Sequence, residues 1–340
     1  MERVVTRAVC ASISKFEGSA MHELLAIRNQ LCAPGRKFRT RVSMLYASRW
    51  FVLWVEGDDD AVDKVLAIAA ADKRVAHHRL LHRSRGPAHL PERINVSTTQ
   101  SPLRPTQYAR LVAQLVERGS TMEPVEICRL LGAPCAIAPH GDLLTRPVRQ
   151  VALLSAEDNG PIDQLRKLGE RFRTPVIYRR FGAARSHTPD VGASYLDMPL
   201  LEGIGRIHLL PRRALEQSMA KRALVRFEAI ALLLGTNAAA AVSVASGLAD
   251  CLQGHSPQPA VYVSGTVEEG SRACARLLET RGIARIALAD PQGTQHDIEA
   301  LLSGFGWRTR GKSVGATPGH APGVSRPLPG WAQLRSVPTI

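Results

Sequence analysis

Acidic and aromatic residues are both scarce in this chain, and each shortage limits the functions that it can have. The 340 residues include 30 Asp and Glu against 44 Lys and Arg, which gives a net charge of +14. This excess favours anionic partners, because clustered cations gain affinity by releasing counterions from phosphate. Aromatic side chains make up only 5% of the chain, however, and single-stranded nucleic acids bind on aromatic stacking surfaces. Nucleic-acid binding is therefore a secondary hypothesis.

Cysteine pairs and long apolar runs are also missing. The six cysteines include no C-x-x-C pair and no neighbouring histidine at zinc-finger spacing, so neither a structural metal nor a disulfide framework is predicted. No apolar run reaches the roughly 18 to 20 residues that a membrane span requires, and the first residues do not form a signal peptide pattern. We expect a cytoplasmic protein that makes no contact with a membrane.

No catalytic constellation is visible in the sequence. The carboxylates gather at expected helix starts, where capping explains them, and His77, His78 and His82 are typical of an exposed basic strand. Residues 306–313 fit the phosphate-loop pattern G-x-x-x-x-G-K-[ST], but the Gly- and Pro-rich residues that follow cannot form the helix that this chemistry needs. We interpret the match as a coincidence, and we expect a disordered basic tail over residues 309–340. A protein that is not an enzyme is favoured, although the question stays open.

The segment from Arg41 to Leu81 carries the clearest order of elements. Alternating apolar residues from Val42 to Tyr46, and then the mostly apolar run Trp50 to Val55, predict two antiparallel strands. Three aspartates, Asp58 to Asp60, stand where a helix needs an N-cap and negative charge. Apolar residues then follow at helical spacing, and a further strand is expected from His78 to His82. A strand over residues 1–14 and a helix over residues 19–31 precede this segment.

This order, together with three short motifs, resembles the BLUF family of blue-light sensors. The motifs are Met44-Leu45-Tyr46, Phe51 to Gly57, and Asp72-Lys73-Arg74. The resemblance implies an α+β, ferredoxin-like N-terminal domain in which a sheet backs two helices and FAD lies between those helices. It also implies that Arg28 or Asn29 on the first helix, and Arg74 after the second, would contact the flavin.

Two positions depart from the family pattern where its photochemistry takes place. In the family a tyrosine on the first strand and a glutamine on the third form a hydrogen-bonded relay to the flavin. In this chain these positions fall on Cys10 and Leu53. A thiol is a weak donor and Leu carries no polar group. The resemblance therefore implies FAD as the cofactor, while the two residues predict degenerate photochemistry. A lowered pKa of the Cys10 thiol would allow redox or adduct chemistry, but a small buried hydrophobe is the favoured interpretation.

The second half of the chain changes to repeated units of strand, loop and helix, which predicts an α/β domain with a mostly parallel sheet. Four domain segments are expected: a BLUF-like domain over residues 1–100, a linker with a helix over 101–147, the α/β domain over 148–308, and the tail over 309–340. Gly235-Thr236 and Gly265-Thr266 each follow an expected strand, where a helix N-terminus can receive a phosphate. The favoured interpretation is that each Gly-Thr pair forms a structural turn.

Two functions follow from these patterns. The first is a sensory or regulatory protein that resembles BLUF photoreceptors and acts by binding an unidentified protein partner. The alternative is an enzyme that binds a nucleotide or another phosphate ligand at Gly235 or Gly265 of the α/β domain.

Overall fold

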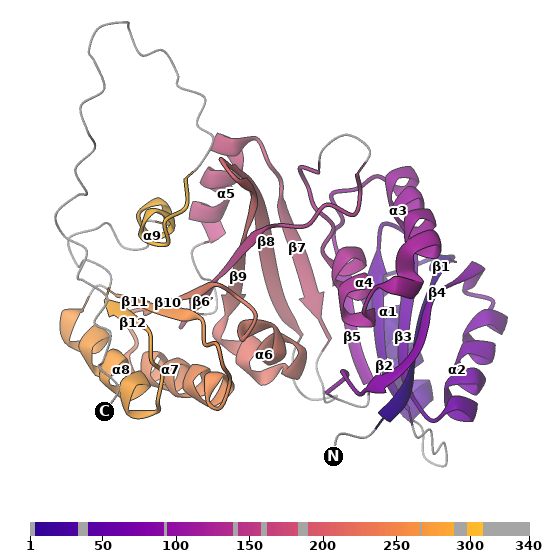
Figure 1. The fold of residues 1–340 in the computed structure, drawn as a ribbon, viewed down its shortest axis with the longest axis horizontal. Coiled ribbons are helices and arrows are strands. Elements are labelled where there is room, and N and C mark those ends of the chain that lie inside the picture. Colours follow the sequence, from indigo (N-terminus) through magenta and orange to yellow (C-terminus); the bar gives the residue numbers. More distant parts are fainter. Residues whose placement is uncertain are drawn as a thin grey trace, which may run out of the picture. The chain divides into compact units, whose positions relative to one another are not determined.

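The computed structural model of the protein describes residues 4–32, 40–91, 94–138, 142–157, 162–182, 190–265, 267–288 and 298–308. The expected tail, residues 309–340, lies outside the described residues. The chain divides into two compact units, neither of them continuous in sequence (Figure 1). The first contains residues 1–146, 175–195 and 216–221, and the second contains residues 147–174, 196–215 and those from 222 onward.

The first unit contains most of the elements expected from the N-terminal sequence. They are β1 (Val4–Ser14), α1 (Ala20–Cys32), β2 (Arg41–Ala47), β3 (Trp50–Gly57), α2 (Asp59–Ala71), β4 (Val75–Pro87), β5 (Ile94–Thr99), α3 (Pro105–Arg118), η1 (Gly119–Thr121), α4 (Pro124–Gly132), β7 (Val176–Phe181) and the first half of β8 (Val191–Leu200). The segment interpreted from sequence as a linker with one helix thus contains two helices, α3 and α4, within this unit.

The strands of the first unit lie in the order β7-β5-β2-β3-β1-β4. β1 pairs antiparallel with β3 and β4, and β2 pairs antiparallel with β3 and parallel with β5. From β1 to β4 the chain thus follows a β-α-β-β-α-β path, in which each crossover helix joins two strands that have one other strand between them in the sheet. The prediction of an α+β, ferredoxin-like N-terminal domain is confirmed.

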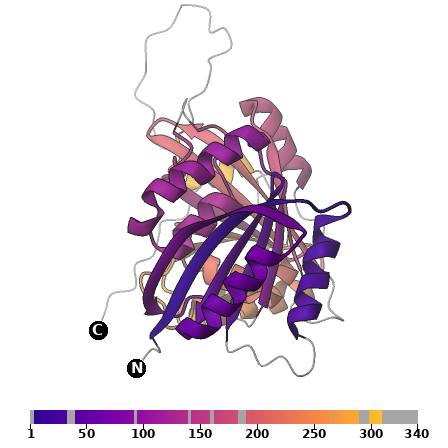
Figure 2. The same cartoon turned by 90° about the vertical axis from the view of Figure 1, so that its right-hand side faces the viewer.

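Helices cover both faces of this sheet (Figure 2). α1 packs on β5 and β2, and α2 packs on β1, β3 and β4; we call this side the α1/α2 face. α4 packs against β1, β2 and β3 on the other side, and α3 packs against β4; this is the α3/α4 face. Because both faces are covered, all eight residues of β3 are buried. That burial explains why β3 has a nearly continuous apolar sequence instead of an alternating one.

Gly119 marks a close approach between the end of α3 and β4. A Cβ atom at this position would overlap the carbonyl oxygen of Leu81, and the carbonyl oxygen of Gly119 lies 2.8 Å from Nδ1 of His82. Since the obstacle is backbone, Gly119→Ala is expected to lower the free energy of unfolding by about 1–3 kcal/mol, measured by chemical denaturation. Gly270→Ala on a solvent-facing helix is the control, because its added Cβ would meet only the Cβ of Val267, at 3.9 Å. Equal losses in the two variants would contradict the prediction.

The second unit contains a sheet with the strand order β12-β11-β10-β6-β9-β8. Its elements are β6 (Arg149–Ser155), α5 (Ile162–Phe172), the second half of β8, β9 (Gly203–Pro211), η2 (Arg212–Glu216), α6 (Ser218–Leu224, shared with the first unit), β10 (Ala229–Leu233), α7 (Ala238–Leu252), β11 (Ala260–Ser264), α8 (Glu268–Thr280), β12 (Ile286–Leu288) and α9 (Ile298–Gly304). The pairs from β12 to β9 are all parallel.

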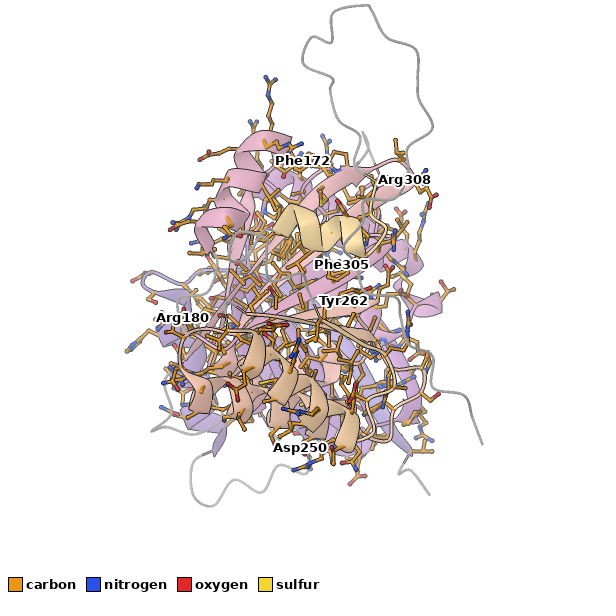
Figure 3. All side chains as sticks on the ribbon, turned by 90° about the vertical axis from the view of Figure 1, so that its left-hand side faces the viewer. Phe172, Arg180, Asp250, Tyr262, Phe305 and Arg308 are labelled. Carbon is orange, nitrogen blue, oxygen red and sulfur yellow. The ribbon has the colours of Figure 1, made fainter. Side chains whose placement is uncertain are left out.

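Helices also cover both faces of this parallel sheet. α7 and α8 lie on one face of β10, β11 and β12, and α9 lies on the other (Figure 1). The ring of Phe305, just after α9, packs edge-on against Tyr262 of β11 with centroids 4.6 Å apart (Figure 3). The prediction of an α/β domain with a mostly parallel sheet is confirmed.

One strand within residues 148–308, the segment expected to form the α/β domain, belongs to the first unit instead. The run at residues 175–178 becomes part of β7, which pairs antiparallel with β5 of the first unit. Its apolar residues alternate as in any half-buried strand, and the sequence alone does not show that its partner strand lies more than 70 residues away.

The hairpin of β8 and β9 was not predicted. It buries an ion pair in which Arg206 Nε donates to Asp197 Oδ1 at 2.6 Å and Arg206 Nη2 donates to Asp197 Oδ2 at 2.9 Å.

Candidate functional site

Three side chains form a row across the centre of the α1/α2 face. Cys10 on β1 stands opposite Leu53 on β3, and Leu53 stands opposite Met44 on β2. Their exposed fractions are 1%, 3% and 0%. Burial raises the pKa of the Cys10 thiol to about 12, and a hydrogen bond with the backbone of Leu53 offsets only part of this rise. Cys10 is therefore a protonated thiol at neutral pH.

This row does not fit the polar edge of a flavin ring. That edge needs side chains that donate and accept hydrogen bonds, and Leu53 and Met44 offer no donor. The Cys10 thiol is a weak one, and its high pKa removes the thiolate as an acceptor. All three side chains are already covered by the protein, since none is exposed by more than 3%. The idea of an activated Cys10 thiolate beside a flavin is wrong for this structure, because burial moves its pKa in the opposite direction.

The three residues expected to contact FAD lie at the ends of the two helices. Arg28 and Asn29 are neighbours near the end of α1, and Arg28 Nη2 donates to Asn29 Oδ1 at 3.4 Å. Arg74 follows α2 and donates from Nε and Nη2 to the two carboxylate oxygens of Asp72, at 3.0 and 2.6 Å. The Arg74 hydrogen bonds lower the pKa of the Asp72 carboxyl. Binding of FAD by Arg28, Asn29 or Arg74 stays a prediction.

Arg74 also reaches back to α1. Its guanidinium lies 3.9 Å from the carboxylate of Glu23 and donates to Oε1 of Gln30 at 3.4 Å. The pKa of Arg74 is raised, first by the hydrogen bond to Asp72 and further by the charge of Glu23. The Arg74 side chain therefore joins the end of α2 to α1. The motif Asp72-Lys73-Arg74, one of the three that resemble the BLUF family, thus has a structural role in this chain.

A buried polar network on β1 and β4 was missed by the sequence analysis. Arg7 is only 4% exposed, and its Nε and Nη2 donate to Ser84 Oγ at 3.2 and 2.9 Å. Ser84 Oγ lies 2.7 Å from His82 Nε2, and Arg7 Nη1 donates to Glu123 at 2.9 Å. Because Ser84 Oγ already accepts from Arg7, it donates its proton to His82. No sequence motif signals this network, since its members are far apart along the chain.

Two of the histidines interpreted from sequence as part of an exposed basic strand, His78 and His82, have different partners. His78 Nδ1 lies 3.1 Å from Ser12 Oγ, while His82 contacts Ser84 and Gly119. Desolvation lowers the pKa of His78 below its usual value. In the part of the chain that the structure describes, no group of three or more His, Cys, Asp and Glu residues can hold a metal ion. None of its helices has the length and apolar content to cross a membrane.

The carboxyl ends of the parallel strands carry the expected phosphate position at Gly235-Thr236. There the backbone N–H of Thr236 donates to Glu157 Oε1 at 3.1 Å, and a Cβ at Gly235 would overlap the same carboxylate. The next helix is capped by Asn237, whose Oδ1 accepts from the N–H of Ala240 at 3.0 Å. A carboxylate of the protein itself thus accepts the hydrogen bond of the Thr236 N–H, and its charge disfavours other anions there. Phosphate binding at Gly235 stays a prediction.

The second expected position has a similar structural explanation. At Gly265 a Cβ would crowd Ser271 Oγ and Leu234, which shows why a residue without a side chain is needed beneath α8. Ser271 Oγ donates to the carbonyl oxygen of Val267 at 3.2 Å. Thr266 lies outside the described residues. Phosphate binding at Gly265 stays a prediction, as does an enzymatic function of this unit.

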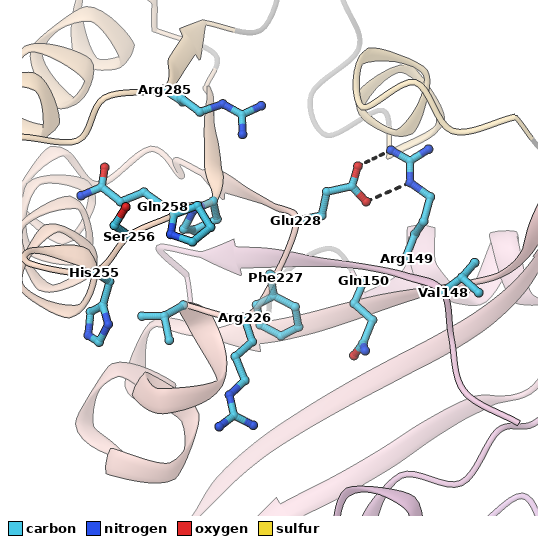
Figure 4. A pocket seen from close by; sticks show the side chains of 13 residues that line it. Val148, Arg149, Gln150, Arg226, Phe227, Glu228, His255, Ser256, Gln258 and Arg285 are labelled. Carbon is cyan, nitrogen blue, oxygen red and sulfur yellow. Dashed lines mark hydrogen bonds and ion pairs between the residues drawn. The ribbon is translucent and has the colours of Figure 1, made fainter. Parts of the chain in front are cut away.

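A cavity of about 560 Å³ lies at the opposite, amino ends of the same strands (Figure 4). Its lining comes from the starts of β6 and β12, from the residues before β10, and from the α7–β11 connection: Val148, Arg149, Gln150, Val225, Arg226, Phe227, Glu228, His255, Ser256, Pro257, Gln258, Pro259 and Arg285. The sequence patterns did not predict this cavity, because ligands of parallel sheets usually bind at the carboxyl ends of the strands.

One wall of the cavity is a closed ion pair. Arg149 Nε donates to Glu228 Oε2 at 2.9 Å, and Arg149 Nη2 contacts Glu228 Oε1. The same guanidinium donates to the carbonyl oxygens of Phe305 and Gly306 at 2.9 and 3.1 Å. It also lies over the ring of Trp307, 5.7 Å from its centroid. Arg149 and Glu228 therefore neutralise each other and fasten the end of α9 to the start of β6.

Comparisons with known proteins find BLUF structures over the N-terminal part of the chain. No family model and no curated protein matches. The solved structures include BlrB, a BLUF protein in its dark state (16% identity, 38% of this chain and 94% of that chain, TM-score 0.26). They also include the BLUF domain of BlrP1 (19% identity, 42% and 96%, TM-score 0.27). BlrP1 from Klebsiella pneumoniae with FMN and cyclic diGMP matches with 15% identity (84% and 76%, TM-score 0.22).

The resemblance stated from the sequence motifs is thus found again among solved structures. At TM-scores below 0.3 and identities below 20%, these matches carry no activity or ligand across to this chain. Its function has to be inferred from its own side chains.

Proposed function

We propose that this is a sensory or regulatory protein whose N-terminal unit is a BLUF-like module without flavin photochemistry. The module acts by binding a protein partner, in the cytoplasm, and the α/β unit serves as its effector. The observation that supports this proposal best is the row of Cys10, Leu53 and Met44, which places three poor hydrogen-bonding side chains at the centre of the α1/α2 face.

The chemistry of the row supports the proposed absence of photochemistry. A light-driven relay needs a side chain that gives up an electron and a proton and an amide that then exchanges its donor and acceptor roles. A thiol with a pKa of about 12 keeps its proton, and Leu53 has neither a donor nor an acceptor. Light absorbed by any flavin beside these residues would therefore leave no rearranged hydrogen bond for α1 or α2 to respond to.

The fold of the module does not depend on the relay. The row belongs to an apolar cluster that also includes Leu24 of α1 and Val62 and Val65 of α2, each at most 5% exposed. Burial of these side chains holds both helices on the sheet at roughly 25 cal/mol for each Å² of apolar surface. A module that has lost its chromophore chemistry can thus keep the surface through which such domains contact other proteins.

The visible absorption spectrum tests this proposal. The purified full-length protein, incubated with FAD and desalted, is expected to show no flavin band that shifts to the red under blue light. A photoactive BLUF domain treated in the same way serves as the positive control. A reversible red shift in this protein would overturn the proposal, because it would show a working relay without a tyrosine or glutamine at positions 10 and 53.

A further inference from the structure

We propose that the cavity at the amino ends of β6, β10, β11 and β12 binds a small organic anion that carries a carboxylate or a phosphate on an apolar body. The proposal does not depend on the function proposed for the N-terminal unit, since every lining residue belongs to the second unit.

Two arginines supply the positive charge. Arg226 and Arg285 both line the cavity (Figure 4). Neither guanidinium has a hydrogen bond or an ion pair with any residue that the structure describes. The third arginine of the cavity, Arg149, is neutralised by Glu228. Arg226 and Arg285 thus add two cations to the lining whose charge Glu228 does not pair with in the described residues. Guanidinium groups recognise carboxylate and phosphate oxygens through charge-assisted hydrogen bonds.

Apolar side chains form part of the remaining lining, next to the polar Gln150, His255, Ser256 and Gln258. Phe227 is 8% exposed and packs on the ring of His208 with centroids 4.9 Å apart. Val225, Pro257 and Pro259 also belong to the lining. Small-molecule sites typically combine an apolar lining with a few convergent polar groups. A bare inorganic ion would leave this apolar surface in contact with water, so the structure favours a ligand with a hydrophobic portion.

Gln258 fixes the loop that separates the two arginines. Its Nε2 lies within hydrogen-bonding distance of the carbonyl oxygens of Leu252 and Gly282, at 3.3 and 3.4 Å, and its Oε1 accepts from the N–H of Ala284 at 3.1 Å. The α7–β11 connection is therefore tied to the segment that carries Arg285. A site held by such bonds before the ligand arrives loses less conformational entropy on binding.

The two ends of the parallel strands also differ in charge. At the carboxyl ends the carboxylate of Glu157 covers the N–H of Thr236. At the amino ends the unpaired charges are those of two arginines. Within this unit an anion is repelled from the usual ligand edge of the sheet and attracted to the opposite one.

Calorimetric titration of the full-length protein tests the proposal with three probes of similar shape. They are 2-naphthoate, 2-naphthyl phosphate and the neutral 2-naphthamide. At least one anion is expected to bind at least about tenfold more tightly than the amide, and the tighter of the two identifies the preferred anionic group. The double variant R226Q/R285Q is expected to weaken that binding by at least about tenfold.

The variant R166Q/R272Q is the matched control. It removes the same charge from the same unit, and both arginines lie in exposed ion pairs on helices away from the cavity lining, with Asp163 and Glu268 respectively. The affinity of this variant for the anion is expected to stay within about twofold of that of the unaltered protein, because salt screens charges on the surface. The proposal is overturned if neither anion binds, if the amide binds equally well, if R226Q/R285Q binds normally, or if both double variants weaken binding equally.

Discussion

Replacing Asp197 by Ala is expected to lower the free energy of unfolding by about 3–5 kcal/mol, the largest loss that we expect from any single change outside the apolar cores. Asp197 is 0% exposed and Arg206 is 2% exposed, and two parallel hydrogen bonds join their side chains. Removal of the carboxylate leaves a guanidinium, whose charge cannot be lost by deprotonation, inside the hairpin of β8 and β9. The cost is that of a buried charge without its partner.

Urea unfolding followed by circular dichroism measures this loss. Asp250→Ala is the control, because Asp250 also pairs with an arginine, Arg281, at 2.9 Å, but the two side chains are 60% and 46% exposed. An exposed pair contributes about 0–1 kcal/mol. If the two variants lose the same stability, the buried pair has no special role. The double variant in which Met replaces both Asp197 and Arg206 should recover much of the loss, since it removes the stranded charge.

Alkylation of Cys10 is expected to be about a thousandfold slower in the folded protein than in the unfolded chain. The reactive species is the thiolate, and burial raises the pKa of Cys10 from 9.0 to about 12. A more basic thiolate is intrinsically more nucleophilic, which offsets part of the thousandfold decrease in the alkylation rate. The 1% exposure of the side chain works in the opposite direction by blocking the reagent. Between pH 7 and 9 the rate should rise about tenfold for each unit, because that range lies below the pKa in the folded state.

Iodoacetamide labelling followed by mass spectrometry of the Cys10 peptide measures both rates. The same protein in guanidinium chloride is its own reference, so differences in peptide recovery cancel. Rapid labelling of Cys10 in the folded state, with a rate that levels off near neutral pH, would show an activated thiolate. That outcome would contradict the buried thiol described for the α1/α2 face and would reopen redox chemistry at this position.

Much of the first unit was predictable, because local sequence patterns indicate its helices and strands. The aspartates that follow Gly57 predicted the start of α2, and the buried stripe with Val62 and Val65 predicted its inward face. The repeated order of strand and helix after residue 148 predicted the parallel sheet in the same way. The helix expected after Gly265-Thr266 is α8, which spans Glu268–Thr280 in the structure.

The remaining features depend on pairs of residues that no local pattern connects. β7 has an ordinary strand sequence, and only the fold shows that it pairs with β5. Asp197 stands within an apolar run as an apparent interruption, and its partner Arg206 is visible only after β8 and β9 pair. The cavity at the amino ends was missed for the same reason, since Arg226 and Arg285 are 59 positions apart in the numbering and each resembles a solvated surface residue.

The contact between Glu157 and Thr236 has a further consequence for how this fold can change its ligands. Because the carboxylate is part of the folded chain, it stays beside the Thr236 N–H. A dilute metabolite that approaches this amide competes with an occupant that never diffuses away. A single mutation at position 157 is therefore the shortest evolutionary step from a self-occupied strand edge to one that is open to solutes.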